Sequence, residues 1–169
     1  MDSHPVCCIT EMPIAVLNRL LNESFAGSEE LVLDSEHKLT IVANAGDGSS
    51  RLQEEASVPP LCDTFAPFVA ASIDDAARHI GDVSYFAVLD QQSLDDSTAL
   101  LLYRQKDGSN STARVTFKSV QHVLVSLSVA TLGFQKTQNI VESQGGIYGR
   151  DENRPKKGGH APPKKLGRA

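Results

Sequence analysis

The chain has few cysteines: Cys7, Cys8 and Cys62 are the only ones among its 169 residues. Three thiols are too few for a disulfide framework, and neighbours such as Cys7 and Cys8 cannot easily bridge each other. No CxxC pair or other Cys/His spacing typical of zinc ligands occurs. The cysteine content therefore favours a reducing compartment and argues against a structural zinc site.

Long hydrophobic runs are also missing. No stretch approaches the roughly 20 apolar residues that a membrane-spanning helix needs. The first ten residues contain Asp2 and no Lys or Arg, so they lack the basic and then apolar layout of a signal peptide. We expect a cytoplasmic or nuclear protein that is neither secreted nor integral to a membrane.

The charge is distributed unevenly along the chain. Residues 1–150 contain 10 Lys/Arg and 19 Asp/Glu, a net charge of −9, whereas residues 151–169 contain 6 and 2, a net charge of +4. Nucleic-acid affinity depends largely on Lys and Arg, so residues 1–150 are a poor match for nucleic acid. The cations that could attract an acidic partner are Arg154, Lys156, Lys157, Lys164, Lys165 and Arg168.

The length and composition indicate one domain followed by a tail. The length of residues 1–150 matches that of one domain of ordinary size. Residues 151–169 have Leu166 as their only large aliphatic side chain, which cannot offset the entropy cost of ordering them. We therefore predict a globular domain over 1–150 and a disordered basic tail over 151–169.

The apolar spacing predicts both helices and strands. Helices are expected from a cap at Thr10 to a stop at Gly27, over 73–80, from a cap at Ser119 onward, and over 134–143. Strands are expected over 38–43, 84–89, 98–103 and 114–117, the last two forming an antiparallel hairpin. The predicted fold class is α+β or α/β, with one mixed sheet of about four or five strands and about three or four helices.

Five short motifs occur in one order in the second half. They are Tyr85–Asp90, Ser93–Asp96, Leu100–Leu102, Leu127–Phe134 and Gly146–Arg150. Residues 84–150 thereby resemble an uncharacterised family of small bacterial and fungal proteins, known mainly as a domain of unknown function. The resemblance implies the α+β fold and the domain limit near residue 150, and it implies no activity. The first half departs from that family, whose usual Trp-containing helix is missing, since this chain has no Trp.

Three carboxylates are the leading candidates for chemistry. Asp90 follows an apolar strand, and Asp95 and Asp96 come soon after it. Carboxylates at the carboxyl end of a strand can hold Mg²⁺ or act as an acid/base pair. The alternative is that Asp90 and Asp95 close turns by accepting hydrogen bonds from neighbouring backbone N–H groups.

Other candidate sites have weaker support. Cys62 with His79, or a serine with His122, could form a nucleophile and base, but no motif fixes their geometry. The Gly46–Gly48 loop lacks the Lys-Ser/Thr of a phosphate-binding loop. The apolar face of 120–127 is typical of core packing, although it could also dock a partner.

The sequence as a whole favours a non-catalytic domain that binds a protein or a small ligand. No cofactor is predicted. The first alternative is an enzyme that uses Asp90 with Asp95 or Asp96, either around a divalent metal or as an acid/base pair. The second alternative is weak nucleic-acid binding through the basic tail.

Overall fold

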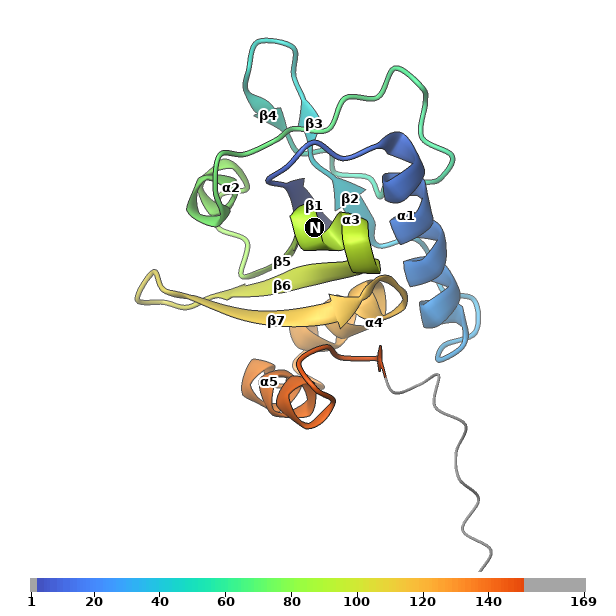
Figure 1. Cartoon of the computed structure of the whole chain (residues 1–169), viewed down its shortest axis with the longest axis vertical. Helices are drawn as coiled ribbons and strands as arrows, with labels where there is room; N and C mark the ends of the chain where they lie inside the picture. Colours follow the sequence, from blue (N-terminus) through green and yellow to red (C-terminus); the bar gives the residue numbers. More distant parts are fainter. Residues whose placement is uncertain (1–2, 151–169) are drawn as a thin grey trace, which may run out of the picture.

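The computed structural model of the chain describes residues 3–150 (Figure 1). The elements in chain order are β1 (His4–Cys8), α1 (Ile14–Glu29), β2 (Leu39–Ile41), β3 (Ala43–Asn44), β4 (Ser50–Arg51), α2 (Ile73–His79), β5 (Tyr85–Leu89), α3 (Gln91–Asp96), β6 (Thr98–Arg104), β7 (Asn110–Thr116), α4 (Phe117–Ser128) and α5 (Phe134–Ser143). None of the helices in this range is long and apolar enough to cross a membrane. The predicted tail over 151–169 lies outside the described residues.

The main sheet has five strands in the order β2-β1-β5-β6-β7. β1 pairs in parallel with both β2 and β5, whereas β5, β6 and β7 are successively antiparallel. β3 and β4 form a separate two-stranded antiparallel sheet. The α+β class and the mixed sheet are confirmed, and the β6–β7 hairpin turns where Lys106–Asn110 predicts it.

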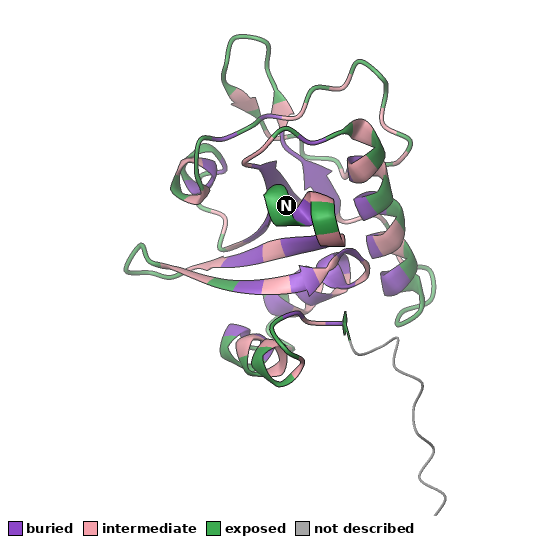
Figure 2. Cartoon of the chain, viewed as in Figure 1, coloured by how far each residue is buried: buried purple, intermediate pink, exposed green. Residues whose placement is uncertain are grey.

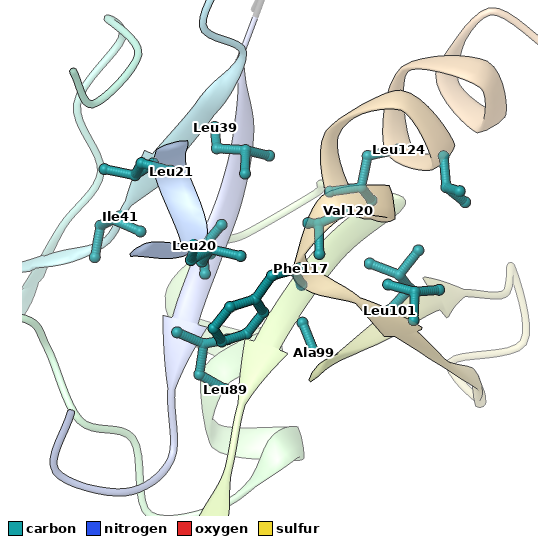
Figure 3. Close-up of a cluster of buried hydrophobic side chains, with 14 of the residues drawn as sticks. Leu20, Leu21, Leu39, Ile41, Leu89, Ala99, Leu101, Phe117, Val120 and Leu124 are labelled. Carbon is teal, nitrogen blue, oxygen red and sulfur yellow. The ribbon is translucent and has the colours of Figure 1, made fainter. Parts of the chain in front are cut away.

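Each face of the main sheet packs against its own apolar layer. Along β5, Ala87 and Leu89 face α1 and α4, while Phe86 and Val88 face α2, because successive strand residues point to opposite faces. Phe117 of α4 points toward Leu20 of α1 and toward Leu89 (Figure 3). The apolar side chains of α4 that could have docked a partner, Val120, Val123, Leu124 and Leu127, are buried in this core.

Several element boundaries differ from the sequence prediction, among them the start of β7, at Asn110 and not at Arg114. α1 begins at Ile14 and not near Glu11, because a residue that precedes proline, here Met12, disfavours the helical conformation. α1 also continues through Gly27 to Glu29. Phe117 begins α4, where its side chain is fully buried, and does not end the preceding strand.

Four elements were not predicted: β1, β3, β4 and α3. β1 is a short run of buried residues without alternation, which periodicity alone does not identify as a strand. α3 is a six-residue helix that occupies the segment interpreted as a turn, and β3 pairs with β4 around the Gly-rich loop. These last three elements are short and have little apolar periodicity, which is the signal that sequence interpretation uses. With α3, the described residues contain five helices.

Candidate functional site

The order of the parallel strands creates a reversal point at the centre of the sheet. The chain leaves β1 through α1 to reach β2 on one side of β1, and then passes through α2 to β5 on the other side. α1 and α2 cover opposite faces of the sheet. In open sheets with parallel strands, ligands bind outside the carboxyl ends of the strands at such a reversal, which is called a topological switch point.

An open cavity of about 500 Å³ lies at this edge, and we call it the switch-point cavity. It is lined by Glu11, Met12 and Pro13 after β1, by Pro67 and Val69, and by Leu94 of α3. Val69 is placed there by backbone pairing, because it forms a parallel bridge with Cys8 and the next residue, Ala70, donates its N–H to the Cys8 carbonyl at 2.8 Å. The carboxyl end of β1 thus forms part of the cavity wall.

Glu11 is the charged group of the switch-point cavity. It is exposed, and within residues 3–150 its carboxylate has neither a hydrogen bond nor an ion pair. The first turn of α1 begins three residues later and contains no acidic side chain. A carboxylate near a helix N-terminus is electrostatically favourable, so this position suits a negative charge.

Asp90 caps α3 and bonds across the sheet to β7. Its carboxylate accepts hydrogen bonds from the Ser93 backbone N–H at 3.1 Å and from the Ser93 hydroxyl. The Asp90 backbone N–H donates in return to the Ser93 hydroxyl oxygen at 3.0 Å, which completes a capping box. The Arg114 guanidinium binds both carboxylate oxygens, the Nη1 contact being 2.9 Å. The side chains are only 22% and 13% exposed, so the ion pair is largely shielded from water.

The environment of Asp90 sets its ionisation. Burial by itself would raise the pKa of this carboxyl, but the hydrogen bonds and charge of Arg114, together with those of Ser93, hold the pKa below its ordinary value. Asp90 is therefore a carboxylate with occupied oxygens. A turn-closing role for Asp90, one of the two sequence alternatives, matches these contacts.

The other two candidate carboxylates have separate surroundings. Asp95 is exposed on α3. Asp96 accepts hydrogen bonds from the Thr98 hydroxyl and from the Gln92 amide, and lies 3.6 Å from the Arg150 guanidinium. Among residues 3–150, no group of three or more His, Cys, Asp or Glu side chains is arranged to hold a metal ion.

The thiols differ from one another in exposure. Cys7 and Cys8 are buried in the sheet, and burial raises the pKa of each to about 12. Cys62 is exposed, and its hydrogen bond with the Thr64 hydroxyl lowers its pKa. His79 is instead bonded to Ser50, so the structure does not pair Cys62 with His79.

A serine, a histidine and an aspartate that sequence interpretation missed do lie together. The Ser50 hydroxyl is 3.0 Å from Nδ1 of His79, and Nε2 of His79 is 3.7 Å from Asp75. Asp75 also accepts from the Ala71 N–H and from Arg78. None of the three residues lines the switch-point cavity. These contacts attach the β3–β4 hairpin to α2.

A second hollow of about 380 Å³ lies between the end of α1, the following loop and α4, and we call it the α1–α4 groove. It is lined by Ser28, Leu31, Val32, Asp34, Ser35, Glu36, Lys38, Gln121, His122, Val125 and Ser126. Leu31, Val32 and Leu33 are 64%, 64% and 87% exposed, and the loop is green in Figure 2. Three consecutive apolar residues after a helix are a signal for this surface that sequence interpretation did not use.

Taken together, the described residues form an α+β domain with a five-stranded mixed sheet and two apolar hollows. Comparisons of the chain with protein-family models, with curated proteins and with solved structures find no match. The family resemblance of residues 84–150 and the tail's suggested nucleic-acid binding stay predictions.

Proposed function

We propose that this chain is a non-catalytic domain that binds a small organic cation with a compact apolar body in the switch-point cavity. The observation that carries the proposal is the position of the cavity outside the carboxyl ends of β1 and β5. That position is favoured for ligand binding because the connections on either side of it run to opposite faces and leave a crevice.

The lining of the cavity supports the chemical class of the ligand. Met12, Val69 and Leu94 offer apolar surface that an aliphatic or aromatic body can cover. The carboxylate of Glu11 can accept charge-assisted hydrogen bonds from an ammonium group. The net charge of −9 over residues 1–150 also raises the local concentration of cations.

The contacts of the candidate acids support a role without chemical conversion. A general base or a metal ligand needs an oxygen that is free to reach the substrate or ion. Both oxygens of Asp90 are bonded to Arg114, and Asp96 is bonded to Thr98 and Gln92. The enzyme alternative would have to break these bonds first.

Binding can be tested by NMR titration with 2-phenylethylamine and its neutral analogue 2-phenylethanol. The amine is expected to shift the backbone resonances of Met12, Val69 and Leu94. Glu11→Gln should weaken amine binding about tenfold, because a charge-assisted hydrogen bond contributes about 1.5–3 kcal/mol. Glu142→Gln, a change at an exposed carboxylate of α5, is the matched control and should leave the affinity unchanged.

Two results would contradict the proposal. If neither probe shifts these three resonances at millimolar concentration, the cavity does not bind this class of ligand. If 2-phenylethanol binds as tightly as the amine and Glu11→Gln has no effect, the charge selectivity is wrong.

The cluster of Ser50, His79 and Asp75 allows a direct test for covalent catalysis. We expect no labelling of Ser50 by a fluorophosphonate probe, because the cluster lies outside the switch-point cavity and a reactive serine needs donors that stabilise an oxyanion as well as a base. Intact-mass measurement after incubation checks this. Labelling of Ser50 that disappears in His79→Ala would instead favour a hydrolase.

A further inference from the structure

We propose that the α1–α4 groove binds the chain's own basic segment, residues 164–168, with Leu166 as the apolar anchor. The groove and this segment are separate from the switch-point cavity, so the inference is independent of the proposed function. It rests on the apolar surface of the groove, the charges at its rim, and the place where the described chain ends.

The apolar surface of the groove is contributed by the loop after α1 and by α4. Leu31 and Val32 line it from the loop, and Val125 lines it from the helix. Val129, one helical turn beyond Val125, is 61% exposed. Leu31 and Val32 are exposed apolar side chains that line a hollow of about 380 Å³, as is typical of a surface that another segment covers.

A buried polar group also lines the groove. Ser28 is only 6% exposed, and its hydroxyl oxygen has no hydrogen-bond partner among the described residues. A buried polar group without a partner is energetically costly. A segment bound in the groove would be a source of the missing hydrogen-bond partner.

The charges around the groove favour a basic occupant. Asp34 and Glu36 line it, and Glu29 and Glu30 are exposed at the adjoining end of α1. Two ammonium groups pair with two of these four carboxylates. Lys38 lies 3.1 Å from Glu36, and Lys118 lies 2.7 Å from Glu30. The rim therefore keeps excess negative charge.

The sequence of the tail matches the chemistry of the groove. Leu166 is the only large aliphatic residue between 151 and 169, and it is flanked by Lys164, Lys165 and Arg168. One apolar anchor surrounded by cations fits an apolar hollow with an acidic rim. The earlier cluster, with Lys156 and Lys157, has no such anchor.

The described chain ends near the groove. Arg150 and Lys118 line the same small hollow, and Lys118 also bonds Glu30, the residue next to Leu31. Figure 1 shows the last described residues at the same end of the molecule as the loop after α1. Thirteen residues separate Arg150 from Lys164, and a linker of that length has a root-mean-square span of about 20 Å.

The proposal can be tested on the full chain by limited trypsin digestion at low salt. Binding in the groove should protect the bonds after Lys164 and Lys165, while the bond after Lys157 in the linker serves as an internal reference. Val32→Asn, which removes apolar surface from the groove without adding charge, should raise the ratio of the first rate to the second about threefold, because a tether supplies an effective concentration in the millimolar range for a weak anchor. In 0.5 M salt the protection of wild type should fall.

Val58→Asn is the matched control, because Val58 is 60% exposed and lies outside the groove, against 64% for Val32. An unchanged ratio in Val58→Asn together with a raised ratio in Val32→Asn supports the proposal. Equal ratios in wild type and both variants would overturn it. Protection that increases with protein concentration would also overturn it, since the occupant would then be the tail of a second copy.

Discussion

Replacing Asp90 with alanine should destabilise the domain by about 3 kcal/mol in urea unfolding. The variant loses the N-cap of α3, which contributes about 1 kcal/mol. It also leaves the Arg114 guanidinium, only 13% exposed, without its carboxylate partner, at a cost of about 2 kcal/mol. Asp90→Asn should cost about half as much, because asparagine can still cap the helix.

The same α3 helix supplies the control for this prediction. Asp95→Ala removes an exposed carboxylate that takes no part in the Asp90–Arg114 pair, and should alter stability by less than about 0.5 kcal/mol. If Asp90→Ala unfolds at the same urea concentration as Asp95→Ala, the ion pair with Arg114 does not stabilise the fold. A stabilisation of wild type by Mg²⁺ that is lost in Asp90→Asn would instead favour the enzyme alternative.

The contribution of Asp90 should depend on pH in a defined direction. Its pKa in the folded state lies below the ordinary value, so at neutral pH its contribution to stability is fully present. As the pH falls below about 4, the unfolded chain takes up the proton first and the contribution decreases. The stability difference between wild type and Asp90→Asn should therefore shrink as the pH is lowered through the folded-state pKa.

Replacing Gly27 with alanine should destabilise the domain by about 2 kcal/mol. A Cβ atom at this position would overlap the backbone carbonyl oxygen of Lys118, because α1 and α4 approach closely there. The adjacent turn of α1 makes a direct bond across the same contact, from the Ser24 hydroxyl to the Phe117 carbonyl at 2.9 Å. Overpacking a close contact typically costs about 1–3 kcal/mol, since backbone must move.

The sign of the Gly27 effect is informative, because helix propensity alone predicts the opposite. Alanine is more favourable than glycine inside a helix by about 1 kcal/mol. Ala26→Gly, the reverse change at an exposed neighbouring position, measures that propensity term in the same helix. If Gly27→Ala stabilises the domain by the amount that Ala26→Gly destabilises it, the two helices are not in close contact at this point.

Local signals in the sequence were sufficient for much of the fold. The apolar spacing of α2, α4 and α5 placed these helices within a few residues of their observed positions. The turn-forming residues 106–110 placed the β6–β7 hairpin. These predictions succeeded because each depends on residues that lie close together in the sequence.

The candidate site was only partly predictable for the same reason. Asp90 was identified from its position after an apolar strand, and its capping of α3 involves a residue three positions away. Its main partner, Arg114, is 24 positions away, and no local pattern indicates that pair. Glu11 was predicted to lie in a helix. In the structure α1 begins only at Ile14, because Pro13 disfavours the helical conformation at Met12, and Glu11 therefore lines the cavity from the loop before the helix.

The sequence by itself determined the fold class, the acidic character of residues 1–150 and the basic character of 151–169, because composition and short-range spacing carry that information. Only the tertiary structure decided that Asp90 meets Arg114, that Gly27 lies against Lys118, and that Glu11, Val69 and Leu94 line one cavity at the switch point. These contacts depend on the order of strands in the sheet and on the crossing of α1 and α4. That order and that crossing follow from packing two apolar faces at once, and no single segment of the sequence specifies them.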